Sequence, residues 1–247
     1  MNPSEKNWFA NWFNEDYDRL YPHRSEEQAQ IQVEFVLREI HRLGNVPKNC
    51  LDLGCGAGRH LAKLKEELPN RAHGMDLSSW LLGRAQTEKN LSVTRGDLRF
   101  LPFQSSSFDL VTNFFTSFGY FGEEEDFAVL KEMSRIVKPK GYLLMDLMNE
   151  SWVVNQLPRE DTTILENGEE VLQTRYFKDG IVCKDKLWKG KKETKTFYER
   201  VRTYSLEKMT KLFEENQLNL VQTFGSEIGE AYDSNSSPRM TLLAQKD

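Results

Sequence analysis

Three glycines and three carboxylates are spaced as in a site for a nucleoside-like ligand. The glycines, in the segment LDLGCGAGRH at residues 51–60, are Gly54, Gly56 and Gly58. The carboxylates are Asp52, Asp76 and Asp97. Glycines at this density let a ligand approach the backbone closely. Three acids around one pocket would repel a pyrophosphate, whereas they suit a ligand with an ammonium group, a diol and an exocyclic amine.

The spacing of the loop argues against two familiar nucleotide sites. A dinucleotide fingerprint would need glycine or alanine where Arg59 stands, and a Walker loop would need a Gly-Lys-Ser/Thr sequence that is absent here. Asp76 lies twenty residues beyond Gly56, a spacing that suits a carboxylate accepting both ribose hydroxyls, although dehydrogenases use the same device. The full set of acids therefore favours a phosphate-free ligand such as S-adenosylmethionine, which also carries a sulfonium.

The elements that must position these residues alternate along the chain. Short apolar strands are expected at residues 50–53, 71–77, 91–97, 108–115 and 142–148. Helices are expected at residues 31–43, 59–68, 78–89 and 123–137. This alternation predicts parallel strands with helices on both faces, and ligands in such sheets bind beyond the carboxyl ends of the strands. The glycine loop, Asp76, Asp97 and the segment 113–120 all follow strand ends.

Over residues 48–148 the sequence resembles the class I S-adenosylmethionine-dependent methyltransferases. The resemblance rests on LDLGCGAG, GMDLS, GDLRFLPF, SFDLVTNFFTSFGYF and IVKPKGYLLMDL, in that order. It implies an α/β fold with a Rossmann-like, seven-stranded, mostly parallel sheet whose last strand is antiparallel, and S-adenosyl-L-methionine as the cofactor. The cofactor-binding residues that it implies are Asp52, Gly54, Gly56 and Gly58 for the methionine end, Asp76 and Leu77 for the ribose, Asp97 and Leu98 for the adenine, and Asn113 and Phe114 beside the sulfonium.

Two segments, YDRLYPHR at residues 17–24 and FFTSFGYF at residues 114–121, resemble a small-molecule subgroup of these enzymes, the sugar N,N-dimethyltransferases and glycine-type N-methyltransferases. YDRLYPHR at residues 17–24 makes Tyr21 and Arg24 candidates for the methionine end of the cofactor. Arg59 is either a partner of the cofactor carboxylate or a surface residue. The candidates for a general base are His23, Tyr120 and Asp146, and the sequence does not choose among them. The aromatic residues at 8–13 are expected to dock onto the core.

We expect one domain over residues 1–247. It comprises an N-terminal helical cover at 1–46, a cofactor-binding core at 47–154, a β insertion at 155–204, and a C-terminal helix with a β hairpin at 205–247. Turn signals at residues 166–168, 178–180 and 189–192 predict a small antiparallel meander over the catalytic mouth. Its lysines form either a charged, solvated surface or a patch that captures an acidic substrate or RNA. They are Lys184, Lys186, Lys189, Lys191, Lys192 and Lys195.

Composition limits the remaining possibilities. The net charge of −5 argues against wholesale binding to nucleic-acid backbones, and three cysteines without a C-x-x-C pair indicate neither a disulfide framework nor a zinc site. We expect no metal, no membrane segment and a cytoplasmic location. The function that the sequence favours is methyl transfer to a nitrogen or oxygen of a small-molecule acceptor. An RNA-binding or RNA-modifying protein with the same fold is the alternative, and the oligomeric state stays open.

Overall fold

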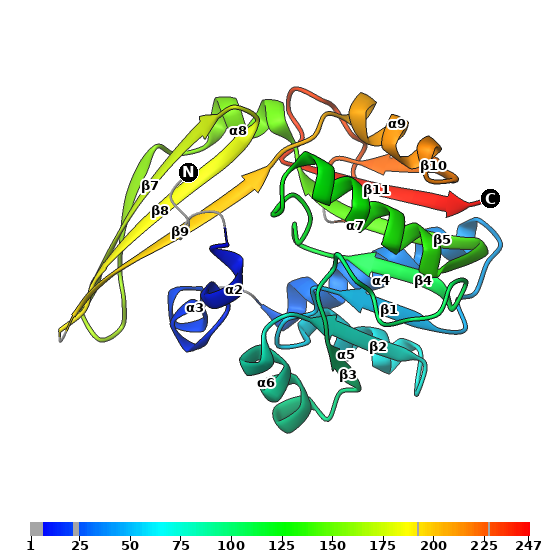
Figure 1. The fold of residues 1–247 in the computed structure, drawn as a ribbon, viewed down its shortest axis with the longest axis horizontal. Helices are drawn as coiled ribbons and strands as arrows, with labels where there is room; N and C mark the ends of the chain where they lie inside the picture. The colour runs from blue at the N-terminus through cyan, green and yellow to red at the C-terminus, as the bar shows by residue number, and fades with distance from the viewer. Residues whose placement is uncertain (1–6, 22–24, 192, 227) are drawn as a thin grey trace.

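The strands that carry the site lie side by side in one twisted sheet (Figure 1). The computed structural model describes residues 7–21, 25–191, 193–226 and 228–247. The sheet has seven strands in the order β10-β11-β5-β4-β1-β2-β3. Their bounds are β1 Cys50–Leu53, β2 Ala72–Asp76, β3 Val93–Arg95, β4 Phe108–Asn113, β5 Val137–Met148, β10 Leu218–Phe224 and β11 Arg239–Lys246. Only β11 runs against the others, because it pairs antiparallel with both β5 and β10, so the predicted fold class is confirmed.

Helices cover both faces of this sheet, which is why every residue of β1 is buried. Leu51 and Leu53 pack with α7 (Glu123–Ile136) and α9 (Leu206–Glu215) on one face. Cys50 packs with α4 (Glu26–Arg42) and α5 (Arg59–Glu67) on the other. The next helix, α6 (Ser79–Lys89), lies beside α5, and the Ser78 hydroxyl caps it by accepting from the backbone N–H of Leu81. The two apolar cores hold the carboxyl ends of β1, β2 and β4 in one place.

Two local expectations were wrong. Helix α4 begins at Glu26, because the Ser25 hydroxyl accepts from the backbone N–H of Gln28, and Ile31 lies on its solvent side with 44% of its surface exposed. Strand β5 begins at Val137, directly after α7, although the Lys-Pro-Lys-Gly segment was expected to separate the two. The pairing of β4 with β5 is interrupted there, since the register shifts between Phe108 and Leu110, and a proline is tolerated at such a bulge.

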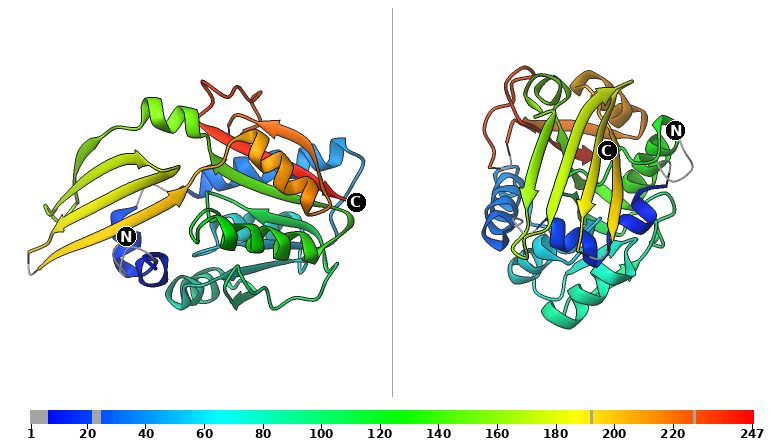
Figure 2. Two further views of the ribbon diagram at one scale, coloured as in Figure 1. Left: turned by 45° about the horizontal axis from the view of Figure 1, so that its top comes forward. Right: turned by 90° about the vertical axis from the view of Figure 1, so that its left-hand side faces the viewer.

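A second sheet of four antiparallel strands projects from the core (Figure 2). Helix α8 (Glu150–Gln156) leads into it. Its strands are β6 Glu160–Ile164, β7 Glu170–Lys178, β8 Ile181–Lys189 and β9 Thr194–Arg202, each paired with the next. The three connections fall at the predicted turns. The predicted meander is therefore confirmed, and we call this sheet the meander.

The N-terminal residues form two short helices between the meander and the core sheet (Figures 1 and 2). From here on we call residues 8–21, which contain α2 (Phe9–Trp12) and α3 (Glu15–Leu20), the cover. Trp8 donates a hydrogen bond from Nε1 to the carbonyl oxygen of Arg200, 3.2 Å away, and its ring lies 4.8 Å from that of Tyr120. The aromatic segment therefore docks on both the meander and the β4–α7 connection of the core, whereas only the core was expected. Among the described residues, no helix is both long and apolar enough to cross a bilayer.

Candidate cofactor and acceptor site

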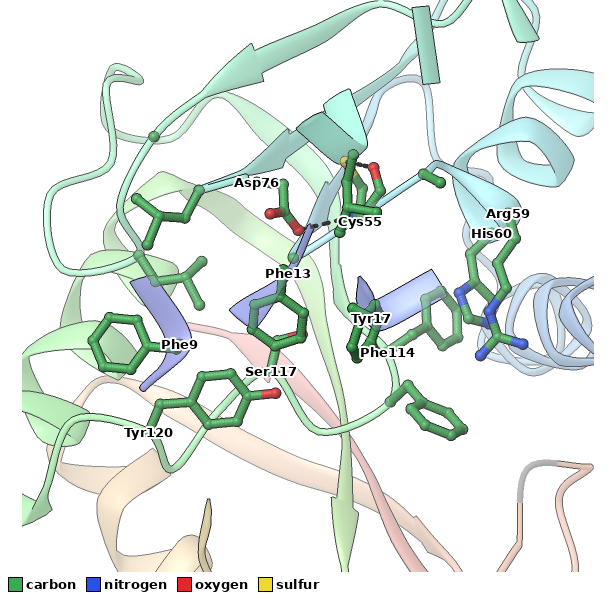
Figure 3. A pocket seen from close by; sticks show the side chains of 18 of the residues that line it. Phe9, Phe13, Tyr17, Cys55, Arg59, His60, Asp76, Phe114, Ser117 and Tyr120 are labelled. Atoms are coloured by element: carbon green, nitrogen blue, oxygen red, sulfur yellow. Dashed lines mark hydrogen bonds between the residues drawn. The ribbon is translucent and has the colours of Figure 1, made fainter. Parts of the chain in front are cut away.

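A pocket of about 380 Å³ lies at the carboxyl ends of β1, β2 and β4 (Figure 3). Small-molecule sites in proteins have volumes of about 300 to 1,000 Å³. The floor is the glycine loop, and the cover contributes Phe9, Phe13, Tyr17 and Tyr21 to the wall. The predicted site residues that line it are Tyr21, Gly54, Gly56, Asp76, Leu77, Asp97, Leu98, Phe114 and Tyr120. Residues from distant parts of the chain thus meet where the resemblance predicts a cofactor.

Asp76 fixes the glycine loop to the start of α6. Its Oδ2 accepts from the backbone N–H of Gly56 at 2.9 Å, and its Oδ1 accepts from the backbone N–H of Ser78 at 2.8 Å. Burial raises the pKa of Asp76, while these backbone hydrogen bonds oppose that shift. At Gly54, φ is +73°, and an added Cβ would lie 2.4 Å from Ser117 Oγ. The loop therefore needs glycine both for its backbone conformation and for its packing against the β4–α7 connection.

Asp52 and Asn113 lie beneath the loop and do not line the pocket themselves. Thr112 Oγ1 donates to Asp52 Oδ1 at 3.0 Å, and Asn113 Nδ2 donates to the carbonyl oxygen of Leu53 at 2.9 Å. The other two side-chain oxygens, Asp52 Oδ2 and Asn113 Oδ1, are buried and have no hydrogen-bond partner among the described residues. Burial, then the charge of Asp76, raises the pKa of Asp52 to about 7, although Thr112 opposes this. Orphaned acceptors under a glycine cradle fit a ligand that brings an ammonium group.

Asp97 and Leu98 line the opposite end of the pocket, where sequence reasoning missed a partner. Arg99 Nη2 donates to Asp97 Oδ2 at 2.8 Å, and the same guanidinium lies over the Phe121 ring at 4.8 Å. Partial burial alone would raise the pKa of Asp97, but the hydrogen bonds and charge of Arg99 lower it. Asp97 is therefore an ionised acceptor at neutral pH. The signal was present in the sequence, because Arg99 is only two residues away.

The cover supplies pocket residues that the sequence placed only in hydrophobic docking. Phe13 and Tyr17 pack edge to face with ring centroids 4.9 Å apart, and Phe13 lies nearly parallel to Tyr120 at 6.3 Å. Asp18 forms an ion pair with Arg84, and both residues line the pocket. The aromatic density of NWFANWF was the available signal. This density predicts that the aromatic rings pack against the rest of the protein, but the sequence alone does not indicate which rings line the pocket.

Arg59 and His60 lie in the pocket wall on the first turn of α5 (Figure 3). The Arg59 guanidinium stacks over the Phe115 ring at 5.0 Å, so Arg59 is not a surface residue. His60 stacks on Phe114 with a centroid distance of 4.2 Å, and its Nε2 is 2.5 Å from Gln32 Oε1. His60 is buried, and it also borders the pocket.

The three candidate bases differ in their surroundings. Tyr120 lines the pocket. Asp146 lies outside its lining, where Arg239 Nε donates to Asp146 Oδ1 at 2.8 Å and the backbone N–H of Phe115 donates to Oδ2 at 3.0 Å. The third candidate, His23, and the cofactor candidate Arg24 lie outside the described residues. Gly58 is the N-cap of α5 with φ of +77° and does not line the pocket.

The lysines of the meander do not form one patch, which corrects that expectation. Lys184, Lys186 and Lys195 point toward the cover, since Lys184 Nζ donates to Tyr21 Oη at 2.5 Å and Lys195 Nζ to Asp16 Oδ2 at 2.7 Å. Lys189 and Lys191 are exposed. Lys192 is outside the described residues. Within the described part of the chain, no group of three His, Cys, Asp or Glu residues could hold a metal ion.

Comparisons with known proteins agree with this geometry. Residues 50–141, from β1 to the first part of β5, match a family model described as a methyltransferase domain. An uncharacterised protein of Methanocaldococcus jannaschii is 26% identical over 216 residues, which cover 86% of this chain and 75% of that protein. A demethylmenaquinone methyltransferase of Staphylococcus haemolyticus is 31% identical over 134 residues, covering 52% of this chain and 54% of that enzyme. The chain thus matches about half the length of that relative.

Solved structures share the fold over nearly the whole chain. An S-adenosylmethionine-dependent methyltransferase from Clostridium acetobutylicum superposes with a TM-score of 0.76 at 20% identity, covering 94% of this chain and 96% of that one. CalS10 from Micromonospora echinaspora, an amino pentose methyltransferase with S-adenosylmethionine bound, gives 0.70 at 19% identity, covering 94% and 97%. Residues 50–141, which carry the glycine loop and the strands beside the pocket, thus match a methyltransferase domain, and the chain has the fold of solved S-adenosylmethionine-dependent methyltransferases.

Proposed function

We propose that this enzyme transfers the methyl group of S-adenosylmethionine to a nitrogen or oxygen atom of a small-molecule acceptor. The observation that carries the proposal is the cover, which closes over the glycine loop and puts Phe9, Phe13, Tyr17 and Tyr21 into the pocket wall. An aromatic wall that closes the pocket suits a methyl acceptor small enough to fit inside it. A folded RNA or a protein surface would instead need an open groove beside the methyl group.

The lining residues divide the pocket between cofactor and acceptor. In this proposal the loop at Gly54 and Gly56, with Asp52 beneath it, holds the methionine end. The remaining cofactor contacts come from Asp76 and Leu77 to the ribose, Asp97 and Leu98 to the adenine, and Phe114 beside the sulfonium, with the buried Asn113 behind it. When bound, the cofactor supplies an electrophilic methyl group that the acceptor atom displaces in line.

The chain's own contribution is then positioning and exclusion of water. Holding a nucleophile in line with its target can lower a barrier by about 7 to 11 kcal/mol, so a base is needed only for an acceptor that must first lose a proton. Tyr120, which lines the pocket opposite Phe13, is the candidate for that role. Tyr21 closes the wall on the side of the meander.

Two relatives support a small acceptor through their names, one an amino pentose methyltransferase and the other a demethylmenaquinone methyltransferase. The RNA alternative depended on a continuous lysine patch. Because Lys184, Lys186 and Lys195 point toward the cover, only Lys189 and Lys191 among the described members offer charge to a polyanion. The meander lysines therefore do not support RNA binding.

The test is incubation of the pure enzyme with methyl-labelled S-adenosylmethionine and a metabolite extract, followed by mass spectrometry of labelled products. We expect labelled molecules in the small-molecule fraction that disappear with the D76A variant. Label found only in macromolecules would overturn the proposal.

A further inference from the structure

The inner face of the meander, which is turned toward the cover, carries three cationic side chains in neighbouring positions. We call Arg175, Lys184 and Lys186 the inner cations. Arg175 of β7 is paired with Lys184 of β8, and Lys186 lies two residues further along β8, on the same face. Directly paired and diagonal neighbours on one face of a sheet are close enough for their side chains to interact. Like charges in these positions repel one another and destabilise the sheet, unless negative charges nearby compensate for them.

Lys186 is the most unusual of the three. It has only 2% of its surface exposed, and it makes no hydrogen bond or ion pair with any described residue. Its ammonium lies 3.7 Å from the centre of the Tyr21 ring and 5.9 Å from that of Trp12. Burial, then the charge of Lys184, lowers the pKa of Lys186 to about 7. A π face attracts a cation but does not replace its hydrogen bonds.

Two carboxylates near the inner cations form ion pairs with Lys184 and Arg175, and neither of them forms one with Lys186. Glu199 Oε1 accepts from Trp12 Nε1 at 3.2 Å and from Tyr21 Oη at 2.5 Å, and its Oε2 is 3.9 Å from Lys184 Nζ. Asp161 accepts from Gln173 and Arg175. Among the described residues, Lys186 is therefore the inner cation for which no ion pair or hydrogen bond is found. A cation on a largely buried side chain is costly when no anion lies beside it, and a bound anion would lower that cost.

Tyr21 connects the inner cations to the pocket. Its ring covers Lys186, its hydroxyl accepts from Lys184, and the same side chain lines the pocket wall. Tyr21 thus borders the pocket and contacts both Lys184 and Lys186, whereas neither lysine lines the pocket itself. The exposed Lys189, by contrast, is ion-paired with Glu170 at 3.4 Å on the surface.

We propose that the methyl acceptor is an anion, and that Lys184 and Lys186 on the inner face of the meander bind its carboxylate or phosphate group beside Tyr21. This inference rests on the proposed function, because it assigns a chemical class to that acceptor. Lys186 supplies the unpaired ammonium and Lys184 the second donor. Arg175 adds positive charge from the neighbouring strand.

Calorimetric titration with inorganic phosphate, and separately with acetate, tests the inner cations directly. The K186M variant keeps the length of the side chain and removes its charge, and K189M makes the same change at an exposed position on the same strand. Wild type and K189M should bind at least one of the two anions equally well. K186M should bind it about tenfold more weakly or worse, the effect of losing one charge-assisted hydrogen bond. The anion that binds distinguishes a phosphate-bearing from a carboxylate-bearing acceptor.

Equal affinity in K186M and K189M, or no binding to wild type, would overturn the inference, provided that thermal unfolding of K186M is cooperative. A second measurement separates this inference from the proposed function. Methyl-labelled products made from a metabolite extract are passed over an anion exchanger, and we expect them to be retained. Products that all flow through would overturn the anionic acceptor and leave the proposed function standing. No labelled small molecule at all would overturn the proposed function itself.

Discussion

At Asp76 a single carboxylate connects three parts of the site, because it accepts backbone hydrogen bonds from Gly56 and Ser78 and faces the pocket. Replacing it by alanine removes the acceptor proposed for the ribose hydroxyls and loosens the glycine loop. We expect D76A to lose about 2 to 4 kcal/mol of cofactor-binding free energy. Isothermal titration with S-adenosylmethionine measures this, and E166A removes an equal charge from an exposed turn of the meander as a control. Unchanged affinity in D76A would contradict the ribose assignment.

Asp52 makes cofactor binding depend on pH. Burial raises the pKa of Asp52 to about 7, so part of the population carries a neutral carboxyl at neutral pH. An ammonium group bound nearby favours the ionised form, and binding should therefore strengthen as pH rises from about 5.5 to about 7, where an α-amino group is still protonated.

The D52N variant cannot ionise and should lose this dependence. Titration calorimetry at several pH values in that window gives both slopes. If cofactor affinity depends on pH equally in wild type and D52N, a group other than Asp52 causes the pH dependence.

At the scale of elements, the cover is held by a few large side chains. Trp12 packs on Phe197 with ring centroids 4.4 Å apart, and its Nε1 donates to Glu199 Oε1. Truncating a buried tryptophan lowers the free energy of unfolding by about 3 to 5 kcal/mol. Helices of four and six residues are not stable on their own, so the cover depends on such packing contacts to stay folded. We expect W12A to release the cover while the core stays folded.

Limited chymotrypsin digestion measures this release as faster cleavage within residues 9–21, with far-UV circular dichroism following the core in urea. W80A, on the half-exposed Trp80 of α6, is the matched control. Cleavage of W12A at the rate seen for W80A would show that other contacts hold the cover.

Local sequence patterns predict the helices, strands and turns of this protein, but not the contacts between distant elements. The alternation of strands and helices, the Ser78 cap and the three meander turns follow from short-range patterns, and they placed Gly54, Asp76 and Asp97 at one edge of the sheet. Arg84 and Phe13 were missed because their roles depend on contacts between α6 and the cover, which no local pattern encodes.

The direction of the meander lysines illustrates the same limit. Alternation along β8 predicts that Lys184 and Lys186 share a face, but only the docking of Trp12 and Tyr21 makes that face the inner one.

For the whole molecule, the buried inner cation Lys186 links stability to pH. Because the folded-state pKa of Lys186 is lowered to about 7 from 10.5, the unfolded chain binds more protons between those values, and this residue's contribution to stability rises with pH across that window. K186M lacks this linkage. Near pH 7 we expect K186M to have a higher free energy of unfolding than wild type. This difference between the two proteins should shrink by roughly 4 kcal/mol toward pH 10.

Urea denaturation of both proteins at about pH 7, 8.5 and 10 measures the difference, and titrating groups remote from Lys186 cancel in the comparison. A difference that does not change with pH would mean that Lys186 keeps its ordinary pKa.

The hydrogen bond from Trp8 to Arg200 joins residues 192 positions apart in the chain. During synthesis the cover is made long before β9, the strand on which it docks. The glycine loop and strands β1–β4 are therefore made before their aromatic roof can close. A nascent chain stalled before β9 would present an open cofactor site, so the pocket can close only after the meander has been made.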